Sequence, residues 1–370
     1  MIEGRVIMRN FQSIVLALLL ALGAAAHAQR ITVLTHSSFA LPQALLDDFT
    51  ARTGVQVTFL QGGDAGEVVN RAVLTKARPL ADVLFGVDGS LLERVRSEGI
   101  FEPYLSPELK RVRPDLLLAT DGLVTPVDVG YVLPNVDSAW FAQHDLALPT
   151  TLEALADPEY RGLTVVENPA SSSPGLAFLL ATIVRFGDEA ADVPGTHADF
   201  DDWLDFWAAL VANDVAVADG WSDAYYTQFT RYGGASPIVV GYATSPAAEV
   251  IFSDEPLQTS PTANLQCAGC AYRQVEGIGI LKGTKEPKAS AAFVDFMLSA
   301  AVQAAIPLAM YVDPVVTDVD LPAEFVAYGQ LEPATIAASL DSATVQANQA
   351  RWLRQWTAVV LQGRDPASVR

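Results

Sequence analysis

The chain has 370 residues, of which 51% are hydrophobic and 18% are charged, and its formal net charge is −20 at pH 7. This length favours two domains, and the apolar content supplies a large core and excludes a disordered chain. The acidic balance, without any Lys/Arg-rich run, argues against nucleic acid as a partner, whereas a cationic ligand is compatible with it.

The first 28 residues have the pattern of a secretory signal peptide. Two arginines precede an apolar run at 13–26, and Ala-His-Ala stands before Gln29 as a cleavage site. No cysteine stands at this site, so no lipid anchor is indicated, and no later segment is long and apolar enough to span a membrane. We therefore expect a periplasmic protein, with the start codon open between Met1 and Met8.

After the signal peptide, short β-rich runs alternate with segments of helical spacing. Strands are expected at 30–36, 55–61 and 81–87, and helices at 41–53, 65–77 and 89–101. This alternation predicts an α/β unit with a largely parallel sheet, in which ligands bind at the carboxyl ends of strands. Two loops qualify as such ends, "THSSF" at 35–39 and "QGGDAG" at 61–66.

The alternation of strands and helices is interrupted at 124–141, where two extended runs follow each other with no long helix between them. A second α/β unit follows, with a strand at 162–169, helices at 173–187 and 199–213, a strand, loop and helix over 215–233, and a strand and helix over 236–252. The run 275–284 is then expected to return to the first lobe as a strand. A helix pair at 287–306 and a terminal helix at 335–361 complete the chain.

These elements predict an α/β protein of two lobes, with mainly parallel sheets joined by hinge strands. Lobe 1 is expected at 29–127 and 275–328, and lobe 2 at 128–274. The C-terminal segment 329–370 is expected to be helical and to pack on the lobes. Two lobes joined by two or more crossings suit a hinge that closes on a ligand.

The only two cysteines are Cys267 and Cys270, in "LQCAGCAYR". In an oxidising compartment such a pair can close a small disulfide, and we interpret it as a structural loop staple. A redox motif would more typically open a helix, and a zinc site would need two more ligands. Because His36, His144 and His197 are scattered along the chain, no metal site is predicted.

Sequence signatures of enzymes are absent. The chain has no G-x-S-x-G nucleophile elbow, no H-E-x-x-H motif and no phosphate-binding P-loop. An exported hydrolase would use Ser172 or Ser222 as its nucleophile, but no local motif links a histidine base to either serine. We therefore expect a binding protein without catalytic activity.

Polar and aromatic residues gather in loops at the predicted strand ends. "SSSPG" places hydroxyls and N–H groups at a helix start, where Ser173 can cap the helix and Ser172 can meet a ligand. A plain cap without any ligand also explains this run. Trp221, in "DGWSDAYY", suits either a stacking platform or the cover of a core edge. Tyr242 precedes "ATSPA", and Asp64 in "GGDAG" offers a carboxylate to a cation.

Nine stretches resemble the thiamine-binding periplasmic proteins of ABC importers, within the wider group of iron- and polyamine-type solute receptors. In chain order they are "TVLTHSSF", "GGDAGEVVNR", "ADVLFGVDGSLL", "VDVGY", "ENPASSSPGL", "GWSDAY", "YATSPA", "VEGIGIL" and "AIPLAMYVDPV". The resemblance runs from about Ile31 to Trp356. It implies the type II architecture of periplasmic binding proteins, with thiamine or a thiamine phosphate bound between the lobes. The implied partners are an inner-membrane permease and its ATPase; the protein is expected to be a monomer without a cofactor.

The resemblance also implies which residues meet the ligand. They are Asp64, Ala65, Ser172, Ser173, Trp221, Tyr242, Ala243, Thr244 and Ser245. The first two would face the aminopyrimidine ring, and the two serines would hold a phosphate or hydroxyethyl group. The indole and the residues from 242 to 245 would line the two sides. Because thiazolium carries a fixed positive charge, each aromatic face adds roughly 0.5–2 kcal/mol of cation–π attraction.

The chain departs from the family pattern at three aromatic positions. His36 and Ala248 stand where tyrosine is common, and Tyr311 stands where tryptophan is common. His36 and Tyr311 are therefore additional candidate contacts, and another small cationic or phosphorylated solute remains an alternative ligand. Tyr225 and Tyr226 superficially suit ferric iron. Ferric receptors, however, carry their paired tyrosines at the loop that here reads "GYATSP".

Overall fold

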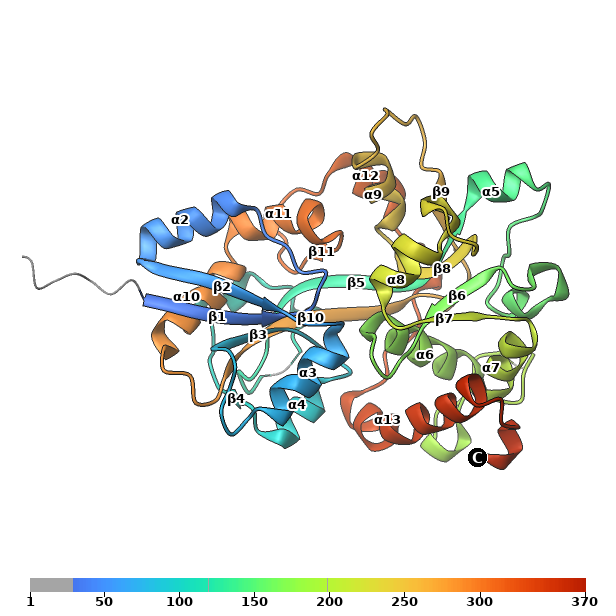
Figure 1. Cartoon of the computed structure of the whole chain (residues 1–370), viewed down its shortest axis with the longest axis horizontal. Coiled ribbons are helices and arrows are strands. Elements are labelled where there is room, and N and C mark those ends of the chain that lie inside the picture. Colours follow the sequence, from blue (N-terminus) through green and yellow to red (C-terminus); the bar gives the residue numbers. More distant parts are fainter. Residues whose placement is uncertain (1–28, 119, 198) are drawn as a thin grey trace, which may run out of the picture.

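A single sheet of eleven strands runs through both lobes of the molecule, as Figure 1 shows. Its central strand order is β2-β1-β3-β10-β5-β8-β6-β7. The structure, a computed structural model, describes residues 29–370 except 119 and 198. The predicted signal peptide therefore lies outside the described residues.

Lobe 1 is built on parallel strands at one end of this sheet. β1 (Gln29–Thr35) pairs in parallel with β2 (Val55–Gln61) on one side and with β3 (Val83–Asp88) on the other. The connecting helices are α2 (Gln43–Thr53), α3 (Ala65–Leu74) and α4 (Leu92–Glu98). The predicted alternation of strand and helix is confirmed. As the sequence indicates, α2 ends at Gly54, whose φ of 73° is left-handed and favours glycine.

Two long strands cross between the lobes. β5 (Thr125–Asp137) and β10 (Tyr272–Leu281) pair with each other in antiparallel fashion. β10 is also antiparallel to β3, and β5 is antiparallel to β8 (Ile238–Tyr242). Parallel pairing is thus confined to the outer strands of each lobe, and the whole sheet is mixed. The predicted class of two α/β lobes joined by hinge strands is confirmed, whereas the residue-level lobe boundaries stay predictions.

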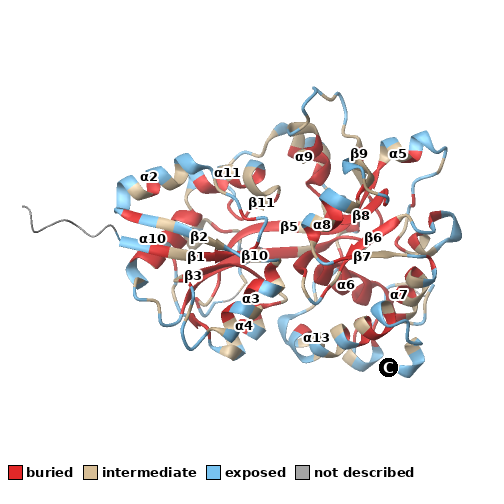
Figure 2. Cartoon of the chain, in the orientation of Figure 1, coloured by how far each residue is buried: buried red, intermediate tan, exposed pale blue. Residues whose placement is uncertain are grey.

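Lobe 2 repeats the parallel arrangement at the other end of the sheet. β6 (Thr164–Glu167) lies between β7 (Ala216–Ala218) and β8 and is parallel to both. Its helices are α5 (Ser138–Gln143), α6 (Ser173–Phe186), α7 (Trp203–Ala212), α8 (Trp221–Asp223) and α9 (Ser245–Ile251). α6 is buried along its whole length (Figure 2). Most of its residues are apolar, which suits a helix enclosed between a sheet and further helices.

Shorter elements complete both lobes. β4 (Phe101–Glu102) pairs with β10, while β9 (Thr262–Asn264) and β11 (Asp313–Pro314) pair with β5. The last helices are α10 (Pro287–Met297), α11 (Ala300–Met310), α12 (Ala323–Tyr328) and α13 (Ser342–Trp356). Within the described range no single helix is long and apolar enough to cross a membrane. Taken together, α10 and α11 pass that test of length and composition, but they are bent by 71°.

Each lobe has an aromatic core of its own. In lobe 2, Trp203 and Trp207 of α7 pack with Trp352 and Trp356 of α13, and all four indoles are buried. In lobe 1, phenylalanines of β3, α2 and α10 fill the space beneath the sheet. Figure 2 shows the buried residues concentrated along the sheet and its facing helix surfaces. The two largest clusters thus lie mainly in different lobes, which β5 and β10 connect.

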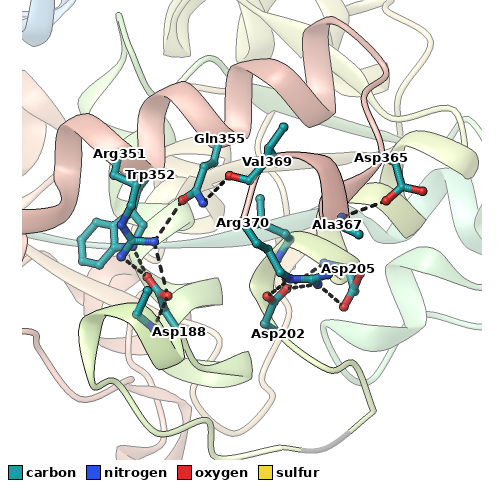
Figure 3. Close-up of polar contacts among 12 residues, drawn as sticks. Asp188, Asp202, Asp205, Arg351, Trp352, Gln355, Asp365, Ala367, Val369 and Arg370 are labelled. Atoms are coloured by element: carbon teal, nitrogen blue, oxygen red, sulfur yellow. Dashed lines mark hydrogen bonds and ion pairs between the residues drawn. The ribbon is translucent and has the colours of Figure 1, made fainter.

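Polar contacts tie the C-terminal segment to lobe 2, as Figure 3 shows. Nη2 of Arg351 lies 2.6 Å from Oδ2 of Asp188, and the indole N–H of Trp352 donates to the same carboxylate. Nε of Arg370 donates to Oδ2 of Asp202 at 2.7 Å. Because α13 also contacts α4 of lobe 1, the segment packs on both lobes. Its helix begins at Ser342, later than the expected 335.

The two cysteines are bonded to each other, while their role as a structural staple stays a prediction. Cys267 and Cys270 are both buried. The carbonyl of Ala268 between them accepts a hydrogen bond from Arg185, which also pairs with Glu153 at 2.5 Å. The disulfide therefore holds a tight turn against the end of α6.

Candidate ligand-binding cleft

A cleft lies between the lobes, at the carboxyl ends of their parallel strands. It contains about 790 Å³ of empty space, its open mouth included. The loop after β1 supplies His36, the loop after β2 supplies Asp64, and the loop after β7 supplies Trp221. This is the position at which open α/β sheets bind ligands, because loops from several strands converge there.

Most of the residues predicted from the sequence line this cleft. They are His36, Asp64, Ser173, Trp221, Tyr242, Ser245 and Tyr311. The other predicted residues are buried behind the walls: Ala65, Ser172, Ala243 and Thr244. Thr244 uses its hydroxyl to donate to the carbonyl of Tyr311, and its side chain thereby joins lobe 2 to lobe 1.

The three consecutive serines lie in three different environments. Ser172 is the N-cap of α6, and its Oγ accepts a backbone N–H of the first turn at 3.3 Å. Ser173 lines the cleft. Ser171 Oγ donates to the carbonyl of Asp219 at 2.7 Å, which joins the loops after β6 and β7. Ser172 and not Ser173 therefore caps the helix, because α6 begins one residue before Pro174, and ligand contact by either serine stays a prediction.

Asp64 contacts both lobes. Its Oδ1 accepts the N–H of Ala65 at 3.0 Å as the N-cap of α3, and its Oδ2 accepts the N–H of Trp221 at 3.4 Å. Beside it, the hydroxyls of Ser38 in lobe 1 and Ser222 in lobe 2 lie 3.4 Å apart. These contacts cross the cleft, so the structure shows the two lobes closed on each other.

An aromatic cluster forms the lobe 2 wall. The indole of Trp221 stacks on Tyr225 with ring centroids 5.1 Å apart and an interplanar angle of 25°. Tyr226 and Tyr242 meet it edge-on, with centroids at 5.4 and 6.0 Å. Trp221 is only 9% exposed, so it both covers a core edge and lines the cleft. The two alternatives considered for this residue are therefore compatible.

Exposed rings surround the mouth. Tyr226, Tyr232 and Phe252 all line the cleft and are 41%, 46% and 51% exposed. Phe252 meets Tyr311 edge-on with centroids 5.0 Å apart, so the pair joins the two lobes. Phe252 follows Ala248 by one helical turn, and it supplies an aromatic surface beside the position where the related sequences carry tyrosine.

Carboxylates face the cleft from both lobes. Oε2 of Glu276 lies 3.3 Å from Nε2 of His36. Burial lowers the pKa of His36, but the charge and hydrogen bond of Glu276 outweigh it, so the pKa is raised. In lobe 2, Glu249 accepts hydrogen bonds from Tyr225 at 2.9 Å and Tyr232 at 3.0 Å. Glu249 also pairs with Arg231 at 2.9 Å.

A further acid lies behind the wall. Glu167, the last residue of β6, is 1% exposed, and neither carboxyl oxygen has a hydrogen-bond partner among the described residues. Burial first, and the charge of Asp64 second, raise the pKa of Glu167 well above its usual range. This carboxyl therefore favours its neutral form.

Sequence reasoning missed several cleft residues, notably Tyr232, Glu249, Phe252 and Glu276. Glu276 carried a signal, because it is a lone charge within the apolar strand "VEGIGIL". Glu249 carried none, since a glutamate on a short helix usually faces solvent. In the described ranges no group of three or more His, Cys, Asp or Glu is placed to hold a metal ion.

Comparison with known proteins gives consistent results. The sequence pattern of the bacterial extracellular solute-binding proteins matches residues 78–330. The thiamine-binding periplasmic protein of Salmonella typhimurium is 29% identical over 351 residues, covering 93% of this chain and 98% of the relative. Iron uptake protein A1 of Synechocystis is 24% identical, covering 88% of each. A solved periplasmic thiamin binding protein superposes with a TM-score of 0.75 at 25% identity, covering 91% of this chain and 98% of its own.

Proposed function

Because the chain belongs to the family of bacterial extracellular solute-binding proteins, we propose that it is the periplasmic receptor of an ABC importer for thiamine or a thiamine phosphate. The receptor would bind this ligand in the cleft and deliver it to a membrane permease with its ATPase. The relatives named for thiamine are matched over nearly their full length, which supports this choice of ligand.

The observation that carries the proposal is the pairing of aromatic rings with carboxylates in one cleft. Thiamine joins a cationic thiazolium ring to an aminopyrimidine. Aromatic faces attract a ring cation, and a carboxylate accepts hydrogen bonds from an exocyclic amine. Trp221 and Tyr242 supply the first kind of group and Asp64 supplies the second.

Ligand binding and closure would be coupled. A ligand held by groups from both lobes gains its full set of contacts only when the lobes are shut, so it stabilises the closed state by its differential affinity. The closed form would then be the one that the permease recognises. The contacts of Asp64 and Ser38 across the cleft support this scheme, because they exist only while the lobes meet.

The cleft is poorly suited to a tyrosine-bound iron ion, although the Synechocystis relative is named for iron uptake. Tyr225 donates its hydroxyl to Glu249 and stacks on Trp221. Burial, followed by the charge and hydrogen bond of Glu249, raises the pKa of Tyr225 well above its usual range. Iron binding by tyrosine requires the phenolate, which this environment disfavours. The adjacent Tyr225 and Tyr226 therefore serve better as ring surfaces.

Calorimetry on the mature protein tests the proposal. We expect thiamine, thiamine monophosphate or thiamine diphosphate to release or absorb heat on binding and to change the fluorescence of Trp221. Absence of both signals with all three compounds would refute the ligand assignment.

A parallel assay with ester and phosphoester substrates tests the alternative of a hydrolase. We expect no turnover of these substrates. Turnover that is abolished by Ser222→Ala would favour a hydrolase instead.

A further inference from the structure

We propose that this cleft selects an unphosphorylated cation and discriminates against its phosphate esters. The inference rests on the proposed function, within which it names free thiamine as the preferred ligand over the monophosphate and the diphosphate. Three features of the described residues carry it: the carboxylates in the two walls, the pairing of the one basic side chain that lines the cleft, and the donors left at the start of α6.

Both walls of the cleft are acidic. Asp64 and Glu276 face it from lobe 1, and Glu249 faces it from lobe 2. Among the described residues that line the cleft there is no lysine or arginine. Glu276 and Glu249 each have a basic partner, whereas Asp64 accepts only backbone N–H groups, so a phosphate ester that brought its anion next to Asp64 would be repelled. Like charges repel more strongly in a partly desolvated cleft than they do in water.

The basic side chains in and beside the cleft are already paired with carboxylates. His36 is the only basic residue among the described lining residues, and its Nε2 lies 3.3 Å from Glu276. The nearest guanidinium in this network, that of Arg231, stands behind the wall and donates to Oε2 of Glu249 at 2.9 Å. Neither group is placed to bind a phosphate without giving up its carboxylate partner. Phosphate sites are normally built on unpaired Arg or Lys.

The start of α6 has few donors to offer. Pro174 in its first turn has no N–H, and the N–H of Gly175 donates to Ser172 Oγ. The N–H of Leu176 donates to the carbonyl of Ser172. Helix starts bind anions through several free N–H groups, and here those of the first turn are mostly consumed. The hydroxyl of Ser173 remains, which suits a neutral hydroxyethyl group.

Comparative affinities test the inference. Binding of thiamine, thiamine monophosphate and thiamine diphosphate to the mature protein should be measured by calorimetry at pH 7 and constant ionic strength. We expect thiamine to bind at least tenfold more tightly than the monophosphate, with the diphosphate weaker still. If either ester binds as tightly as thiamine, the inference is wrong while the proposed function stands. If none of the three binds, the proposed function itself fails.

A matched pair of charge variants tests the cause. Phe252 is 51% exposed at the mouth of the cleft, whereas Leu74 is 86% exposed at the end of α3 and does not line the cleft. Phe252→Arg should strengthen binding of the monophosphate and reduce the preference for thiamine at least threefold. Leu74→Arg adds the same charge to the acidic protein and should leave the preference unchanged.

A second cleft variant controls for the loss of the Phe252 ring, which could itself change the affinities. Ala248→Lys places a cation one helical turn earlier on α9 and removes no aromatic group. It should likewise reduce the preference for thiamine. If neither cleft variant changes the ratio of affinities, or if Leu74→Arg changes it equally, a missing cation in the cleft is not the cause and the inference fails.

Discussion

Asp64 uses its two carboxylate oxygens on different lobes, one on the N–H of Ala65 and the other on the N–H of Trp221. Helix capping and lobe closure can therefore be separated by substitution. Serine is as good an N-cap as aspartate, but its side chain is shorter and uncharged. Asp64→Ser should keep the unfolding midpoint close to that of the wild type and weaken ligand binding at least tenfold.

Asp64→Ala is the matched comparison, because it removes the cap as well. It should weaken binding by a similar factor and also reduce stability by about 1 kcal/mol. Thermal unfolding and calorimetry on both variants separate the two roles. If Asp64→Ser binds the ligand as tightly as the wild type, the carboxylate is only a cap.

Glu167 has a buried carboxyl whose oxygens have no partner among the described residues, and its folded pKa is raised. Such a group contributes stability that is fully present below its unfolded pKa of about 4.3 and is lost as the pH rises through the folded pKa. Glutamine cannot ionise, so Glu167→Gln escapes this loss. The variant should therefore be more stable than the wild type at pH 8.

Urea unfolding at pH 4 and pH 8 checks this expectation. The difference between Glu167→Gln and the wild type should be small at pH 4 and should favour the variant at pH 8. Glu255→Gln, at an exposed position, provides a control that should not alter the pH dependence. A variant that is less stable than the wild type at pH 8 would mean that the carboxylate is ionised and bound to an ordered partner.

At the scale of elements, α13 is held by a partly buried ion pair between Arg351 and Asp188, whose side chain is 7% exposed. Removing one member of such a pair leaves the other charge uncompensated, and the cost for buried pairs is about 3–5 kcal/mol. Because Arg351 is partly exposed, Arg351→Ala should reduce the free energy of unfolding by the lower end of this range, about 3 kcal/mol. Arg354→Ala, on the exposed side of the same helix, should change it by less than about 0.5 kcal/mol.

Chemical denaturation of both arginine variants measures these differences. The measurement also shows whether the C-terminal segment unfolds together with lobe 2. Equal loss of stability in the two variants would mean that α13 is held by its apolar face alone, through Trp352 and Trp356.

Most elements could be predicted from the sequence because their signals are local. Alternating strands and helices, the helix pair at 287–306 and the stop at Gly54 depend on residues a few positions apart. The start of α6 was displaced by one residue, since proline is accepted at the second helical position as well as the first. The region 221–228 was harder, because a three-residue helix is followed there by a π-helical turn.

The site was predicted less completely than the fold for a physical reason. Its walls come from separate segments of both lobes, and only the closed fold brings them together. Asp64 and Trp221 belong to recognisable motifs, whereas Glu276 and Phe252 belong to a strand and a helix end with other apparent roles. Antiparallel pairing of β5 and β10 was also hidden, because local patterns do not report the direction of a distant partner.

At the scale of the whole molecule, closure brings α3 of lobe 1 against the serine loop of lobe 2, residues 168–172 between β6 and α6. A Cβ on Gly66 would lie 2.8 Å from the backbone oxygen of Ser171, a contact too short to exist. Gly66→Ala should therefore hinder closure. Because alanine favours helices over glycine, the variant should be as stable as the wild type or up to about 1 kcal/mol more stable. Its affinity for the ligand should fall at least tenfold.

Small-angle scattering with and without ligand tests this separation of stability from closure. The radius of gyration of the wild type should decrease when ligand is added, whereas that of Gly66→Ala should not. Gly63→Ala is the control, because its new methyl group would meet only the flexible side chain of Glu67. Compaction of Gly66→Ala to the wild-type value would show that the serine loop yields to the methyl group.

The two ends of the described chain lie on different lobes (Figure 1). Gln29 opens β1 in lobe 1, while Arg370 is bound to Asp202 beside α7 in lobe 2. Rotation of the lobes about β5 and β10 therefore changes the separation of these two ends. A donor dye attached near Gln29 and an acceptor fused after Arg370 would convert closure into a change in energy transfer. The scaffold thus lends itself to a reagentless optical sensor for its own ligand, without any label placed in the cleft.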